Sequence, residues 1–182
     1  KPIRAINESE LNAALVTLLS IRHINGARQW DADASDIWLL RKYKEKFEIA
    51  HGENADLYWD DTLLSELAQE SSITARMCKQ RLRSISWFED FKIRYADRMP
   101  QDANGNKEKF VKTDYYLFTE LCKSKVVRDT ILGCNDNDVV ASDAAAEAIF
   151  KWVFEKPSHV DAEDNENKFY AHRCVGHLAA MK

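Results

Sequence analysis

The chain has 182 residues, a formal net charge of −4 at pH 7, and 45% hydrophobic residues. This length and hydrophobicity allow one sizeable core and exclude a disordered tail. The negative charge excludes a protein that coats nucleic acid through bulk positive charge, so any DNA binding must come from a local basic patch. Only 5 glycines and 3 prolines interrupt the chain, which favours long helices over many short strands. We therefore expect an all-α protein.

The cysteines and the hydropathy of the chain indicate its compartment. Cys78, Cys122, Cys134 and Cys174 lie far apart and form no C-x-x-C pair. Scattered thiols of this kind are typical of reduced, buried side chains in a cytosolic protein. The sequence contains no signal peptide and no apolar run of membrane-spanning length, so we expect a cytoplasmic protein without a membrane partner. Because the chain begins at Lys1 without a methionine, we interpret it as a fragment of a longer protein.

The first 56 residues predict two helices. The sequence at residues 7–10 is typical of a helix cap, and apolar residues at helical spacing predict a helix over residues 8–23 that Asn25 and Gly26 end. Asp33 is placed to cap a second helix, whose charged outer face we interpret as solvated. Residues 52–56 are predicted to form a loop.

Residues 60–86 carry the pattern of a helix-turn-helix. Glu66, Leu67 and Ala68 supply its E-L-A sequence, a turn follows at Ser71 and Ser72, and a second helix opens after it. The turn usually contains glycine, because its backbone needs a positive φ, and here Ser72 takes that position. Apolar residues recurring at helical steps predict one buried face, made by Leu64, Leu67, Ile73, Met77, Cys78, Leu82 and Ile85.

The opposite face of the second predicted helix carries our candidate DNA-binding residues, which are Thr74, Ala75, Arg76, Lys79, Gln80 and Arg83. Arginine and glutamine can bond the edges of bases, whereas lysine and threonine suit phosphates. Residues 76–98 contain seven basic and three acidic side chains, so this part of an acidic chain is locally basic. The alternative interpretation of the same residues is a solvated helix face.

The second half of the chain follows a polar linker. The second helix of the pair is expected to continue past Ser84, either as one long helix or broken near Ser86. Met99 and Pro100 should end it, because the residue before proline disfavours helix. Residues 101–112 are the predicted linker, which divides the chain into a helical domain over residues 1–100 and a helical subdomain over residues 113–182. Within that subdomain we expect helices over residues 115–123, 144–154 and 168–181, and a turn system near residues 126–132 that Gly133 closes.

The sequence offers no catalytic constellation, since it has neither a nucleophile in a glycine-framed turn nor a phosphate-cradling loop. His172, Cys174 and His177 are of zinc-binding types, but on a helix residues 172 and 174 point apart by about 200 degrees, and no fourth ligand is in sight. We therefore predict no catalytic residue, no metal and no cofactor, and assign any enzymatic activity to a missing N-terminal domain.

Taken in order, these landmarks resemble the region downstream of the N-terminal domain in ParB-like (ParB/sulfiredoxin-fold) proteins. Arg22 and His23 with Trp30 resemble the entry to the family's DNA-binding region, and residues 63–82 resemble its helix-turn-helix. Residues 116–133 resemble the aromatic helix and the Leu-Gly stop that come after it. The resemblance covers roughly residues 21–133. The motifs of the N-terminal domain are absent, so the resemblance implies DNA binding and no catalysis.

We therefore predict a helix-turn-helix domain that recognises double-stranded DNA through the helix starting near Thr74. The resemblance places it in a partition, mobile-element or defence context, associated with a bacterial nucleoid or plasmid. A homodimer on a palindromic or repeated site is expected, because two-fold symmetry presents two recognition helices to successive major grooves. The alternative is a helical protein-interaction or dimerisation module without nucleic-acid binding, which docks a partner through the aromatic-rich residues 115–154.

Overall fold

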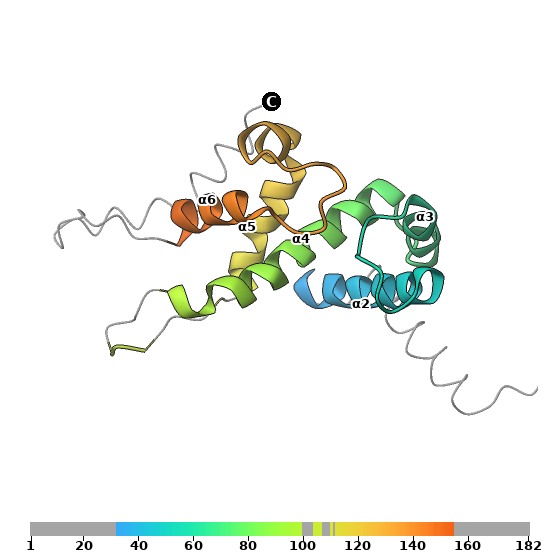
Figure 1. Ribbon diagram of the computed structural model, residues 1–182, viewed down its shortest axis with the longest axis horizontal. Helices are drawn as coiled ribbons and strands as arrows, with labels where there is room; N and C mark the ends of the chain where they lie inside the picture. Colours follow the sequence, from blue (N-terminus) through green and yellow to red (C-terminus); the bar gives the residue numbers. More distant parts are fainter. Residues whose placement is uncertain (1–31, 100–103, 107–109, 111, 155–182) are drawn as a thin grey trace, which may run out of the picture.

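Helix α4 (Ala75–Tyr95) crosses the middle of the molecule, and the other helices pack along it (Figure 1). The computed structural model describes residues 32–99, 104–106, 110 and 112–154, and these contain helices and no strand. The expected all-α fold is confirmed. The predicted helices at residues 8–23 and 168–181 lie outside the described residues, as do His23, Trp30 and the zinc-type residues near 174.

The elements follow one another in a simple order around α4. Before it come α2 (Ala32–His51) and α3 (Asp61–Glu70), which pack against each other and against α4. The remaining elements follow α4 in the chain and are η1 (Ala96–Arg98, a 3-10 helix), α5 (Lys112–Lys123), η2 (Val126–Ile131, a π-helix) and α6 (Asp143–Val153). Among these, α5 packs most extensively on α4. No helix in the described ranges is long and apolar enough to cross a membrane.

The pair α3 and α4 forms at the predicted place. The Asp60 carboxylate caps α3 by accepting hydrogen bonds from the N–H groups of Thr62 and Leu63, at 2.8 and 3.1 Å. The Thr74 hydroxyl caps α4 by accepting from the Met77 N–H at 3.2 Å. These side chains satisfy backbone donors that the first turn of a helix leaves free.

The turn between α3 and α4 is a Schellman motif. The N–H of Ser72 donates to the Gln69 carbonyl at 3.1 Å, and the N–H of Ile73 donates to the Ala68 carbonyl at 3.0 Å. A Schellman motif needs a left-handed conformation at the first residue after the helix C-cap. That residue is Ser72, and its φ is 55°. Ser72 therefore takes the positive φ for which this turn usually contains glycine.

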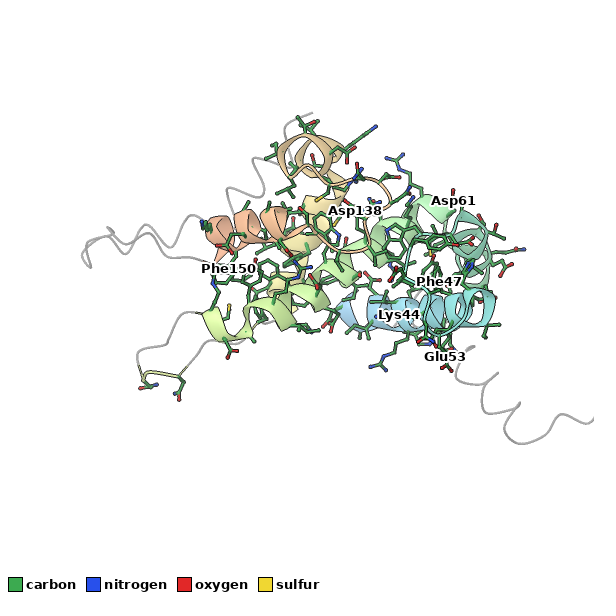
Figure 2. The ribbon with its side chains drawn as sticks, viewed as in Figure 1. Lys44, Phe47, Glu53, Asp61, Asp138 and Phe150 are labelled. Atoms are coloured by element: carbon green, nitrogen blue, oxygen red, sulfur yellow. The ribbon has the colours of Figure 1, made fainter. Side chains whose placement is uncertain are left out.

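One hydrophobic core runs through the described helices on both sides of the predicted linker. Phe47 lies toward one end of it and Phe150 toward the other (Figure 2). Between them, Phe91 of α4 contacts Phe118 of α5 and Phe150 of α6, with ring centroids 5.1 and 6.1 Å apart. The aromatic residues before and after residues 101–112 thus stabilise the same core.

Helix α4 is the axis of this core. It continues past Ser86 without a break, and every residue from 82 to 88 is buried, so its middle contacts other elements on all sides. Its first turns differ, because the expected inward position of Met77 is wrong and that side chain is 50% exposed. Cys78, Leu82 and Ile85 set the inner face, and Met77 is turned from Cys78 by about 100°.

A candidate nucleic-acid interface

The first turn of α4 is exposed to solvent. Thr74, Ala75 and Arg76 are all exposed, and the guanidinium of Arg76 makes no ion pair with a described residue. This is the end of a helix at which backbone N–H groups point outward and favour negative charge. The sequence prediction that these residues form an outer face is confirmed for this turn.

A cavity of about 410 Å³ lies beside this turn, between α4 and the segment that joins α5 to η2. Six cationic and two anionic side chains line it, which is an excess of four positive charges in a chain of net charge −4. The lining residues are Arg76, Lys79, Gln80, Arg83, Cys122, Lys123, Lys125, Arg128, Asp129 and Asp136. Four of the six predicted site residues therefore meet in this basic cavity, and Thr74 and Ala75 do not line it.

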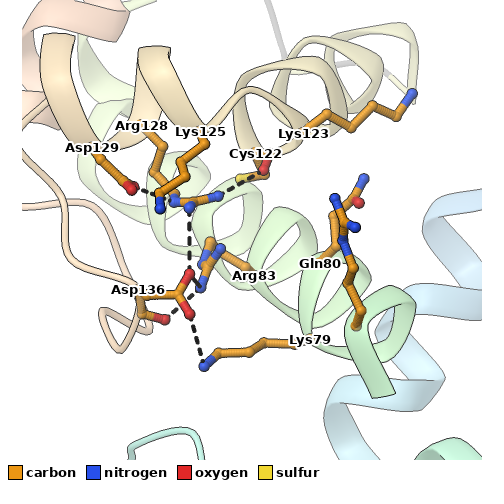
Figure 3. Close-up of a pocket in the computed structure, with 10 residues that line it drawn as sticks. Lys79, Gln80, Arg83, Cys122, Lys123, Lys125, Arg128, Asp129 and Asp136 are labelled. Carbon is orange, nitrogen blue, oxygen red and sulfur yellow. Dashed lines mark hydrogen bonds and ion pairs between the residues drawn. The ribbon is translucent and has the colours of Figure 1, made fainter. Parts of the chain in front are cut away.

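Asp136 gathers three of the cationic side chains (Figure 3). Its carboxylate lies 3.2 Å from Lys79 Nζ, 3.1 Å from Arg83 Nη2 and 3.3 Å from Arg128 Nη2. Partial desolvation raises the pKa of Asp136, but Lys79 and Arg83 outweigh it and hold that pKa below its ordinary value. The side chain of Asp136 is nevertheless 64% exposed, so the carboxylate lies at the mouth of the cavity.

Arg83 does not lie on an exposed face, and that part of the sequence interpretation is wrong. Its side chain is only 4% exposed, and its Nη2 donates to the backbone carbonyl and the carboxylate of Asp136. The reason is the second half of the chain, which packs over α4 at this level and covers the position. Sequence reasoning treated the helix pair as an isolated unit, in which the same position would face solvent.

Arg128 is a functional candidate that sequence reasoning did not identify. It is buried, and its Nη1 donates to the Cys122 carbonyl at 3.1 Å, where it satisfies a free acceptor at the C-terminus of α5. Its Nε donates to Asp129 at 2.8 Å. Sequence reasoning included Arg128 only within residues 116–133, as part of the segment that resembles ParB-like proteins. A signal was present, since basic residues recur at positions 123, 125 and 128.

Cys122 lines the cavity as an inert thiol. Burial raises its pKa to about 12, and burial also raises that of Cys78 to about 12. A thiol with such a pKa is a poor nucleophile and a poor metal ligand near neutral pH. No group of three or more His, Cys, Asp or Glu side chains within the described ranges could hold a metal ion. What the cavity offers chemically is a set of hydrogen-bond donors and positive charge, which suits an anion.

Comparison with known proteins gives no match to a family, to a curated protein or to a solved structure. The resemblance to ParB-like proteins therefore stays a prediction.

Proposed function

We propose that the protein binds duplex DNA through the first turns of α4, as the helix-turn-helix domain of a ParB-like protein. The observation that carries the proposal is the exposed Arg76, which forms no ion pair with a described residue, at the start of a capped helix beside a cavity with an excess of positive charge. The N-terminal residues of a recognition helix are those that reach base edges in known helix-turn-helix complexes. A basic face on an acidic chain is also what a locally acting DNA-binding surface requires.

The residues of this face divide by the chemistry of their side chains. Arg76 and Gln80 can form paired hydrogen bonds with base edges, so they are proposed to read sequence. Lys79, Lys123 and Lys125 present single positive charges, so they are proposed to contact phosphates. Lys123 and Lys125 come from the second half of the chain, which would thus contribute to the same interface.

A homodimer on a palindromic or repeated site follows from the limited exposure of α4. The middle of the helix is buried on all sides over residues 82–88, so its exposed N-terminal part, which begins at Ala75, is only about two turns long. Such a short contact gives little discrimination, and a second copy one helical turn of DNA away would supply the remainder. The resemblance to ParB-like proteins implies a partition, mobile-element or defence context for such a dimer, associated with a nucleoid or plasmid.

The alternative is a helical interaction module that docks a partner through its aromatic second half. Most of the described aromatic side chains there, including Tyr115, Phe118 and Phe150, are buried in the protein's own core. Tyr116 and Ile131 are the large hydrophobic residues of that segment that the structure leaves exposed. The alternative therefore has little apolar surface in the described residues, and a complex of that kind would be insensitive to salt.

The experiment that tests the proposal is selection of bound duplexes from a random pool with the 182-residue chain, followed by fluorescence anisotropy at several salt concentrations. Arg76→Ala should weaken binding to the selected duplex by about 1 to 3 kcal/mol and relax its sequence preference. Lys125→Ala should weaken all duplexes alike and lower the salt slope by about one.

The matched control is Lys151→Ala, which removes one positive charge from an exposed position on α6, away from the cavity. It should leave both the affinity and the salt slope unchanged. Absence of affinity for any duplex at low salt would overturn the proposal. Equal losses of affinity in Arg76→Ala and Lys151→Ala would show that binding depends only on the total charge of the protein. That result would exclude recognition of the DNA sequence by α4.

A further inference from the structure

The floor of the cavity contains a buried guanidinium with unused donors. Arg83 has five N–H donors, yet all its hydrogen bonds to described residues come from Nη2. Its Nε is buried and makes no hydrogen bond to any residue that the structure describes. A buried charged donor without an acceptor is costly to a folded protein, so such a group in a cavity indicates a place where an acceptor binds.

Among the described residues, Asp136 is the one that accepts hydrogen bonds from Arg83, and its carboxylate is shared with other cations. Lys79, Arg83 and Arg128 all turn toward it, so the single negative charge of one carboxylate faces three positive charges (Figure 3). A phosphate group has three strong acceptor oxygens and more negative charge, and arginine binds it in a paired geometry. Three convergent cations therefore fit a phosphate better than they fit one carboxylate.

Asp136 can leave this position without refolding of its loop. Its side chain faces solvent, and the backbone on either side is held independently. The Cys134 N–H donates to the Arg128 carbonyl at 3.0 Å, and the Trp59 indole N–H donates to the Asp138 carbonyl at 3.2 Å. Rotation of one short side chain would therefore remove the carboxylate from all three cations, while the loop stays in place and Arg83 keeps its hydrogen bond to the Asp136 backbone carbonyl.

We propose that this cavity is a phosphate-binding site, with Arg83 and Arg128 at its floor and the Asp136 carboxylate as an internal anion that a phosphate displaces. The volume of about 410 Å³ exceeds that of a bare phosphate, so the site takes the phosphate of a larger molecule. That phosphate belongs either to a small phosphorylated ligand or to the backbone of the bound duplex. The proposal of a phosphate-binding site does not depend on which of the two supplies the phosphate, and it does not depend on DNA binding.

The test is calorimetric titration of the 182-residue chain with inorganic pyrophosphate at low salt. The wild type should show saturable binding, and Asp136→Asn should bind pyrophosphate about tenfold more tightly, because the internal competitor loses its charge. Lys79→Gln, which removes a partly exposed cation from the site, should weaken binding by a similar factor.

Asp143→Asn is the matched control. It removes the same charge from a fully exposed carboxylate, which pairs with Arg94. Neither residue lines the cavity, so the affinity for pyrophosphate should not change. An equal gain in Asp143→Asn and Asp136→Asn would show a bulk charge effect and overturn the proposal, as would absence of saturable binding to the wild type. If Asp136→Asn fails to fold, the comparison of the wild type with Lys79→Gln tests the proposal. Equal affinities of these two proteins for pyrophosphate would overturn the phosphate-binding site.

Competition between pyrophosphate and a labelled duplex distinguishes the two sources of phosphate. Displacement of the duplex at pyrophosphate concentrations near its own dissociation constant assigns the site to a DNA backbone phosphate. A duplex that stays bound while the site is filled assigns it to a small phosphorylated ligand. A chain that binds pyrophosphate and no duplex at all would reject the DNA proposal and keep this one.

Discussion

Ser72 is the only non-glycine residue with a positive φ among the described residues. A left-handed conformation costs an L-residue with a Cβ about 1 to 2 kcal/mol, whereas glycine adopts it freely. Ser72→Gly should therefore raise the free energy of unfolding by about 0.5 to 1 kcal/mol, as measured by urea denaturation. Ser65→Gly, at an exposed position inside α3, is the control and should lower it. A loss of stability in both variants would contradict the strain at Ser72.

Because of Asp136, the free energy of unfolding should depend on pH in the acidic range. Its pKa is lower in the folded state, so its contribution to stability is present above the unfolded pKa of about 3.9 and is lost as the pH falls through the folded value. Asp136→Asn should thus be less stable than the wild type at pH 7. The difference in urea midpoint should shrink progressively below about pH 4. A difference that stays constant with pH would contradict the ion pairs with Lys79 and Arg83.

At the scale of the elements, a buried polar network joins α2, α4 and α5. One oxygen of the Asp36 carboxylate accepts from Arg81 Nε on α4, and the other accepts from the Tyr115 hydroxyl on α5. Burial raises the pKa of Asp36, and Arg81 and Tyr115 oppose this by hydrogen bonding to the ionised form. The network fixes how the three helices sit against one another, since each partner comes from a different helix.

Tyr115→Phe should destabilise the protein by about 1 to 3 kcal/mol, because it leaves one oxygen of a buried carboxylate without its donor. The neighbouring Tyr116→Phe removes the same hydroxyl from a side chain that is 59% exposed and should change stability little. Urea denaturation of both variants measures the contrast. Equal effects of the two substitutions would show that the buried hydroxyl does not contribute through Asp36.

The elements themselves follow from local sequence. Asp60 and Ser142 cap α3 and α6, and Gly133, with a φ of 63°, follows η2 as predicted. These features depend on neighbours within a few residues, which a sequence displays directly. The contact of Arg83 with Asp136 joins residues 53 positions apart, so it depends on how α5 and η2 lie on α4. For that reason the sequence predicts the outer face of the first turn of α4, but it does not predict the cavity beside that turn or the burial of Arg83.

At the scale of the molecule, the single core predicts cooperative unfolding. Phe91 contacts aromatic rings of α5 and α6 and is 1% exposed, so Phe91→Ala should lower the free energy of unfolding by about 3 to 5 kcal/mol. Tryptophan fluorescence and helical circular dichroism should lose their signals in one coincident transition, in the wild type and in the variant. Two separate transitions would instead support independent halves on either side of residues 101–112.

The burial of α4 along its middle also limits how the protein can change its preference for a ligand. A helix that only touches a partner can be resurfaced at many positions, but here substitutions at residues 82–88 would disturb the core. Before this buried stretch, Ala75, Arg76, Lys79 and Gln80 lie in the first two turns beside the cavity and can vary without disturbing the core. Variants with altered specificity, whether natural or selected in the laboratory, should therefore concentrate their substitutions in these two turns and in the lysines at the end of α5.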